Sequence, residues 1–171
     1  MHEGAAPGWW RWLLLSAAVV ALDLASKAWL TRILVPGEGH DITSFLRIVL
    51  VFNTGAAFSF LAQAGGWQRW FFAGLAAVIS AVLVVALRRH RGSPVVAAAL
   101  ALVLGGALGN LWDRLTLGRV VDFVLLHVGA YSWPAFNVAD SAITVGVAIL
   151  VIESLWPKRP RVAEGIGREE A

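Results

Sequence analysis

Four long apolar stretches constrain the fold of this chain more than any other feature of its sequence. They cover residues 12–34, 70–87, 95–111 and 138–156. An α-helix rises about 1.5 Å per residue, so ~20 apolar residues cross a hydrocarbon core of about 30 Å. With 58% hydrophobic residues among 171 and a mean hydropathy of +0.72, the chain is too apolar for a soluble domain. We therefore predict an all-α membrane protein, with residues 1–171 forming a single four-transmembrane-helix domain.

The first apolar stretch has an alternative interpretation as a signal peptide, because residues 12–22 resemble a short apolar core after Arg11. No convincing small-x-small cleavage site follows, however, and the apolar pattern continues beyond Asp23 and Lys27. These two charges lie four residues apart, on one face of a helix, where they can form an ion pair. We interpret the stretch as the first span and the pair as a structural contact that turns this helix toward the bundle.

Two clusters of basic residues predict the orientation of the spans. The second span is followed by Arg88, Arg89 and Arg91. The fourth span is followed by Lys158, Arg159 and Arg161. Cytoplasmic loops of membrane proteins are enriched in lysine and arginine, so both clusters are expected in the cytoplasm. Both termini then lie inside, and the connections after the first and third spans lie outside. The mixed polar tail from about residue 161 is predicted to be disordered.

Two segments in the outer connections have the composition of strands. Residues 44–52 and 119–128 are rich in β-branched and aromatic residues. In the third span, by contrast, small residues recur every four positions, which is typical of a face where membrane helices pack closely: Ala97, Ala101, Gly105 and Gly109.

Polar side chains gather in residues 109–140, which hold three aspartates, two asparagines and two arginines between two apolar runs. Ionisable groups at membrane depth cost several kcal/mol unless they are paired or hydrated, so such a segment is a functional-site hypothesis. Asp122 and Asp140 stand on either side of a turn in this segment. Two carboxylates within a few ångströms of each other cannot both ionise readily, so the pair can act as acid and base at once. The pattern favours aspartic-peptidase chemistry.

Each of these aspartates also has a purely structural interpretation. Asn137 is placed to cap the fourth helix, and Asp140 would then lie at position N3, where free N–H groups and the helix dipole favour a carboxylate. Asp122 can pair with Arg114 or Arg119. For each residue taken alone, both interpretations stay open.

Other chemistries have little support in the sequence. Cysteine is absent, which excludes a thiolate nucleophile, and no Gly-x-Ser-x-Gly site is present. The four histidines lack the i, i+4 spacing of a helical zinc site, so we predict no metal. A proton-coupled transporter would spread charges through several helices and usually carry an internal repeat, and neither is found. A non-catalytic assembly factor would leave the two aspartates unexplained.

Five sequence blocks resemble those of the signal peptidase II (lipoprotein signal peptidase) family of four-span bacterial membrane aspartyl peptidases. The blocks read D-x-x-S-K, N-T-G-A-A-F, G-N-x-x-D-R, V-V-D-F and F-N-x-A-D, and they begin at Asp23, Asn53, Gly109, Val120 and Phe136. They occur in the family's order and extend from the first span to the last. One block alone would be a weak signal, whereas five in register are highly specific.

The resemblance implies that Asp122 and Asp140 are the catalytic pair. It also implies that four polar residues line or brace the substrate site: Asn53, Asn110, Arg114 and Asn137. Three charged residues are implied to support the site: Asp23, Lys27 and Asp113. The implied substrate is a prolipoprotein whose lipobox cysteine carries diacylglycerol, cleaved on the amino side of that cysteine.

The resemblance further implies a place in the bacterial cytoplasmic (inner) membrane, with the active site at the outer face. The outer strand-like segments would form a small extracytoplasmic β-cradle over the bilayer. Membrane lipids are expected partners, nucleic acid is not, and neither a metal nor an organic cofactor is implied. We expect the protein to act as a monomer.

Overall fold

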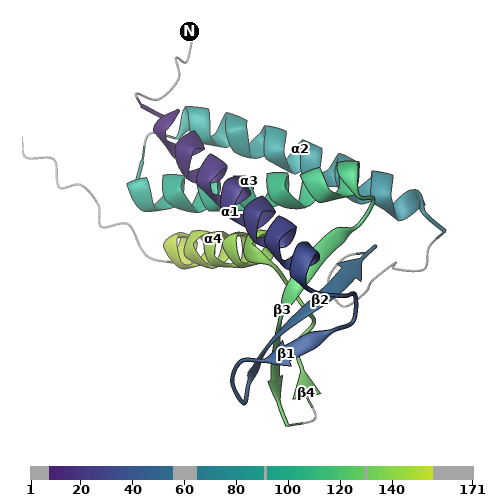
Figure 1. Cartoon of the computed structure of the whole chain (residues 1–171). Coiled ribbons are helices and arrows are strands. Elements are labelled where there is room, and N and C mark those ends of the chain that lie inside the picture. The colour runs from purple at the N-terminus through teal and green to yellow at the C-terminus, as the bar shows by residue number, and fades with distance from the viewer. Residues whose placement is uncertain (1–7, 56–64, 91, 130, 156–171) are drawn as a thin grey trace, which may run out of the picture.

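The computed structural model describes residues 8–55, 65–90, 92–129 and 131–155. They contain four long helices: α1 (Arg11–Ile33), α2 (Trp67–Arg89), α3 (Pro94–Thr116) and α4 (Val138–Leu155). All four are long and apolar enough to cross a membrane, which confirms the predicted membrane bundle. Figure 1 shows that α1 begins, and α4 ends, at the end of the bundle that lies away from the sheet.

Helix α3 is the centre of the bundle. In its most apolar window 56% of the residues are buried inside the protein, against 28% in α1 and 17% in α2 and α4, so the outer faces of those helices are left for lipid. The predicted small-residue face packs on α1. Ser16 Oγ donates to the carbonyl oxygen of Ala101 at 2.8 Å, and a Cβ at Gly105 would lie only 2.7 Å from Val19 Cβ. Any larger side chain at Gly105 would push α1 away.

A second small-residue face of α3 holds α4. A Cβ at Gly106 would collide with the backbone carbonyl oxygen of Ala139, and a Cβ at Gly146 would lie 2.7 Å from the carbonyl oxygen of Ala99. One glycine on each helix therefore lets the two backbones approach closely. This contact fixes the N-terminal turn of α4, which carries Asp140, against α3.

Four strands form an antiparallel sheet in the order β1 (Gly39–Asp41), β2 (Leu46–Asn53), β3 (Val120–Val128) and β4 (Tyr131–Ser132). Figure 1 shows the sheet extending from one end of the helices. The strands predicted at 44–52 and 119–128 are confirmed as β2 and β3, with small shifts of their bounds. A buried apolar cluster joins the end of α1 to these two strands: Leu30, Leu34, Leu50, Val121 and Phe123.

Helix α3 ends later than we predicted. The third span was expected to stop at residue 111, but α3 continues to Thr116, so Asp113 and Arg114 are helical residues and not loop residues. Asn110 and Asp113 are buried, and both have hydrogen-bonding or charged partners inside the bundle. Because polar side chains with internal partners need no water, they do not end a helix. Some predicted features lie outside the described residues: Arg91, the end of the fourth span at residue 156, and the basic tail.

Candidate active site

Asp122 and Asp140 reach the same pocket from different elements. Asp122 belongs to β3, and Asp140 belongs to the first turn of α4. Both line a pocket of about 850 Å³ between β2, β3, α3 and α4, together with Asn53, Asn110 and Arg114. The fold thus gathers five of the residues that the sequence singled out around one cavity.

Asn137 contacts both aspartates from a fully buried position. Its Nδ2 donates to Asp122 Oδ1 at 2.7 Å, and its Oδ1 accepts from the backbone N–H of Asp140 at 2.9 Å. The backbone N–H of Asn137 in turn donates to Asp140 Oδ2 at 3.3 Å. These reciprocal bonds are a capping box, which confirms the predicted cap of α4. The same residue links the cap to Asp122, so Asp140 caps its helix and also lies near the other aspartate.

Two further asparagines donate to the carboxyl groups. Asn110 Nδ2, from α3, donates to Asp140 Oδ1 at 2.7 Å. Asn53 Nδ2, from the end of β2, donates to Asp122 Oδ2 at 3.2 Å. All four carboxyl oxygens of the pair therefore accept N–H groups, which fixes the direction in which each carboxyl group faces.

The environment of Asp122 changes its ionisation. The residue is only 2% exposed, and its burial, followed by the negative charge of Asp140, raises the pKa of Asp122 from 3.8 to about 7. The hydrogen bonds from Asn53 and Asn137 and the charge of Lys27 act in the opposite direction, because they favour the charged form. In a large share of the molecules, the carboxyl group of Asp122 therefore carries a proton at neutral pH.

Arg114 braces the rim of the pocket, and the charges of Asp140 and Asp122 act on its guanidinium from beyond ion-pair distance. Its Nη2 donates to the carbonyl oxygen of Gly55 at 3.1 Å, and its guanidinium lies 5.3 Å from the ring centroid of Phe72. Arg119 lies over another ring, 3.7 Å from the centroid of Phe52. Among the described residues neither arginine forms an ion pair with Asp122, so the alternative interpretation of Asp122 as an arginine-paired residue is wrong. Asp122 faces inward to amide donors, while the guanidinium groups lie against carbonyl oxygens and rings.

Three buried charges lie behind the pocket. Lys27 Nζ lies 2.6 Å from Asp23 Oδ2, which confirms the predicted ion pair within α1. The same ammonium lies 2.9 Å from Asp113 Oδ2 of α3, a contact that the sequence did not predict. None of the three residues lines the pocket. These three residues belong to the part of the bundle that supports the pocket.

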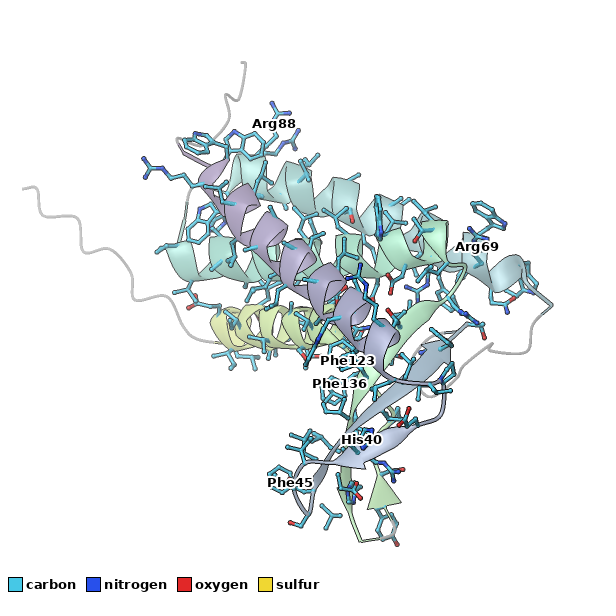
Figure 2. The ribbon with its side chains drawn as sticks, viewed as in Figure 1. His40, Phe45, Arg69, Arg88, Phe123 and Phe136 are labelled. Atoms are coloured by element: carbon cyan, nitrogen blue, oxygen red, sulfur yellow. The ribbon has the colours of Figure 1, made fainter. Side chains whose placement is uncertain are left out.

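Arg69 is a supporting residue that the sequence analysis missed. It stands at the beginning of α2, where Figure 2 labels it, and it donates to the carbonyl oxygens of Arg114 at 2.8 Å and Leu115 at 2.7 Å. The last carbonyl groups of a helix lack partners within the helix, so Arg69 caps α3 beside the pocket. A single arginine close to a span carries no distinctive sequence signal for this role.

The apolar wall of the pocket was also missed in part. Phe136 lines the pocket, and Figure 2 shows it beside Phe123 where the sheet meets the helices. Ile143 and Thr144 line it from α4. Thr144 follows Asp140 by four residues, so helical spacing from the candidate aspartate was a signal that could have placed it on the same face.

In the described parts of the chain, no group of three His, Cys, Asp or Glu side chains is arranged to hold a metal ion. The two aspartates that line the pocket instead accept hydrogen bonds from amide side chains and from a backbone N–H. The absence of a metal or organic cofactor stays a prediction.

The fold and the pocket together define an integral membrane protein with a helical bundle and two aspartates facing one cavity, the side-chain set of a membrane aspartic peptidase. A sequence model of the family described as Signal peptidase (SPase) II matches residues 15–156. The chain belongs to this peptidase family. Membership decides between the alternatives of transporter, assembly factor and peptidase in favour of the peptidase, and places the chain among multi-pass proteins of the bacterial inner membrane.

Individual relatives agree with the family match. The chain is 51% identical over 144 residues to the lipoprotein signal peptidase of Cupriavidus taiwanensis, covering 84% of this chain and 82% of that protein. It is 53% identical over 140 residues to the lipoprotein signal peptidase of Azoarcus sp. (strain BH72), covering 82% and 80%. A bacterial membrane enzyme solved by the in meso method at 2.3 Å resolution superposes with a TM-score of 0.81 at 28% identity, covering 98% of this chain and 99% of the other.

Proposed function

We propose that Asp122 and Asp140 are the catalytic pair with which this chain removes the signal peptide from diacylglyceryl-modified prolipoproteins. Removal of that peptide is the activity of the family to which the chain belongs. The observation that carries the assignment of the pair is the side chain of Asn137, which hydrogen-bonds Asp122 and caps the turn that presents Asp140. Both carboxyl groups also face one pocket.

The raised pKa of Asp122 supports different roles for the carboxyl groups of Asp122 and Asp140. Because two adjacent carboxylates cannot both ionise readily, the group that keeps the proton at neutral pH is Asp122 and the base is Asp140. Asp140 takes a proton from water as the water oxygen attacks the carbonyl carbon on the amino side of the lipidated cysteine. Asp122 gives its proton to the carbonyl oxygen, so the first step ends in a neutral tetrahedral diol.

The second step restores both groups. The C–N bond breaks as the leaving nitrogen takes the proton that Asp140 holds, and Asp122 recovers a proton from one hydroxyl of the diol. The products are a carboxylic acid on the signal peptide and a free amine on the lipidated cysteine. Each carboxyl group returns to its starting state, so the reaction consumes only water.

The pocket also suits a lipidated substrate. Much of its wall is apolar and comes from the sheet, from α4 and from the segment just before α4: Val51, Phe52, Leu125, Leu126, Phe136, Ile143 and Val145. Buried acyl chains contribute about 0.8 kcal/mol per CH₂ group, so the lipid can supply much of the binding energy. A substrate anchored in the same leaflet reaches such a pocket by lateral diffusion.

We further propose that the pocket opens at the outer face of the inner membrane and that both termini are cytoplasmic. The basic residues at the end of α2, Arg88 and Arg89, support this orientation, since they lie at the opposite end of the bundle from the sheet. One chain supplies both aspartates, which supports a monomer as the working unit.

The proposal is tested with purified protein in lipid vesicles and a synthetic prolipoprotein peptide. We expect the diacylglyceryl-modified peptide to be cut once, on the amino side of the modified cysteine, as read by mass spectrometry. The same peptide without lipid is the matched control and should be processed at least about tenfold more slowly, because the acyl chains no longer contribute to binding. Equal rates on the two peptides would contradict the lipid-recognition part, and no cleavage of either would contradict the function.

A further inference from the structure

Each proposed catalytic aspartate is preceded by a residue whose backbone N–H is held by another, buried carboxylate. Ala139 precedes Asp140, and its N–H donates to Asp23 Oδ1 at 2.9 Å. Asp23 belongs to α1 and is completely buried. The first turn of α4 is therefore attached to α1 one residue before Asp140.

The same arrangement occurs on the strand side. Val121 precedes Asp122, and its N–H donates to Asp113 Oδ2 at 3.1 Å. Asp113 belongs to α3 and is 2% exposed. The backbone of β3 is therefore attached to α3 one residue before Asp122.

Lys27 connects the two attachments. Its Nζ lies 2.6 Å from Asp23 Oδ2 and 2.9 Å from Asp113 Oδ2, and the residue is 3% exposed. One ammonium group thus holds both carboxylates that hold the backbone beside the proposed pair. The path from Asp140 to Asp122 through these residues consists of the peptide links to Ala139 and Val121 and four polar contacts of 2.6 to 3.1 Å.

Lys27 also determines how Asn110 is oriented. Its Nζ lies 3.3 Å from Asn110 Oδ1, and an ammonium group can only donate, so the amide must turn its oxygen to Lys27. The NH₂ group of Asn110 is then left for Asp140, to which it donates at 2.7 Å.

We propose that Asp23, Lys27 and Asp113 form a positioning clamp that sets the spacing of Asp122 and Asp140. The inference rests on the proposed function of that pair. Stability alone is a poor explanation for the cluster, because apolar residues in place of a buried ion group are often neutral or stabilising. Catalysis needs tighter control, since a displacement of about 1 Å can cost on the order of 100-fold in rate. A clamp that grips the residue beside each aspartate supplies that control.

Asp113 offers a matched pair of variants. In Asp113→Asn the charge is lost, but one amide oxygen can still accept from both Lys27 and Val121, because both contacts use Oδ2. In Asp113→Ala the same charge is lost together with the acceptor. The clamp predicts that kcat falls on the order of 10–100-fold in Asp113→Ala and much less in Asp113→Asn, with KM nearly unchanged in both.

Asp23 provides a second comparison that does not depend on an alanine variant being folded. Its two oxygens have separate partners, Ala139 and Lys27, so an asparagine can keep only one of the contacts. Asp23→Asn should therefore be at least about tenfold slower in kcat than Asp113→Asn, although both remove one charge. A purely structural role would lower the unfolding temperature and leave kcat per folded molecule equal in the two variants.

The pH profile supplies a further readout. The charged groups around Asp122 are Asp140 on α4, Lys27 on α1 and Arg114 on α3. If the clamp loosens and Asp140 moves away, its repulsion weakens, so the falling limb of kcat against pH should move to lower pH in Asp113→Ala relative to Asp113→Asn. Wild-type cleavage of the lipidated peptide, and its loss in Asp122→Asn, test the proposed function separately. If both of those results are obtained, an equal kcat and an equal position of the falling limb of kcat against pH in the two Asp113 variants would overturn the clamp.

Discussion

Asn137 donates a hydrogen bond to Asp122 at 2.7 Å from a side chain that is completely buried. The oxygen of the same amide, Oδ1, caps α4 by accepting from the N–H of Asp140 at 2.9 Å. The residue therefore holds together two parts of the site that lie on different elements. These two roles use different atoms, so substitutions can separate them.

Asn137→Ser should keep the cap and lose the donor, because a serine oxygen caps helices well but does not replace the amide N–H. Asn137→Ala should lose both, with about 0.5–2 kcal/mol of stability lost through the cap alone. In both variants the pKa of Asp122 should rise, since this hydrogen bond favours its charged form. Unfolding in detergent and kcat/KM against pH measure the two effects. Wild-type pH profiles in both variants would show that Asn137 does not act on Asp122.

The pKa of Asp122 near 7 predicts the pH dependence of the wild-type enzyme. The rate of cleavage should fall as the pH rises through about 7, because Asp122 then loses the proton that it gives to the carbonyl oxygen. Asn53→Ala removes a hydrogen bond that lowers this pKa, so it should move the falling limb to higher pH. A rate that stays constant from about pH 6 to about pH 9 would contradict the role of Asp122 as the acid.

The same pKa has a consequence for stability. It is raised above its ordinary value of 3.8, so between about pH 4 and pH 7 the folded state binds more protons than the unfolded state. The contribution of Asp122 to the free energy of unfolding is therefore most favourable below about pH 4 and declines as the pH rises through about 7. Asp122→Asn should remove this decline, which unfolding in detergent at several pH values can measure.

Local patterns in the sequence were enough for much of the fold. Four apolar stretches gave the spans, and the spacing of Asp23 and Lys27 gave their ion pair, because residues four apart share a helix face. The cap formed by Asn137 and Asp140 follows from its three-residue spacing in the same way. Each of these contacts lies within one element.

Contacts between elements could not be predicted in the same way. Lys27 meets Asp113 because small residues bring α1 and α3 close together; their four-residue spacing predicted a close-packed face on α3 but not which helix packs on it. The sequence left open a pairing of Asp122 with a neighbouring arginine, but the strand turns Asp122 toward asparagines from other elements. The catalytic and binding roles of the site residues stay predictions.

The close contact of α3 with α4 predicts that Gly106→Ala is harmful. The added methyl group would collide with the carbonyl oxygen of Ala139, next to Asp140, and a backbone atom cannot turn away. We expect a loss of about 1–3 kcal/mol in stability and a marked loss of activity. Gly74→Ala on α2 is the matched control, because its Cβ would meet nothing within 4 Å. A neutral or slightly stabilised Gly106→Ala variant would contradict this packing.

Orientation in the membrane is tested with reporter fusions. Fusions at Gly92 and at the C-terminus should report the cytoplasm, because arginines concentrate at the end of α2. A fusion at Gly37, between α1 and β1, should report the outer side. If Gly37 proved cytoplasmic, the proposed position of the pocket at the outer face would be wrong.

The proposed catalytic pair is separated from its structural roles by isosteric substitutions. If Asp140 only caps α4, Asp140→Asn should lose about 0.3–1 kcal/mol of stability and keep most of its activity. A catalytic pair predicts that Asp122→Asn and Asp140→Asn each lose on the order of 10²–10⁴-fold in rate, because an amide neither takes a proton from water nor gives one to a carbonyl oxygen. Both variants should still insert and fold, which membrane levels and unfolding curves can check.

The double variant and a control complete this test. Asp122→Asn combined with Asp140→Asn should be little slower than either single variant, since residues that act as a unit have non-additive effects. Asp41→Asn makes the same charge change on β1, where Asp41 lies 3.7 Å from Arg47 and its side chain is 62% exposed, so it should keep nearly full activity. A rate within about threefold of wild type for Asp122→Asn or Asp140→Asn, at normal protein levels, would remove that residue from the mechanism.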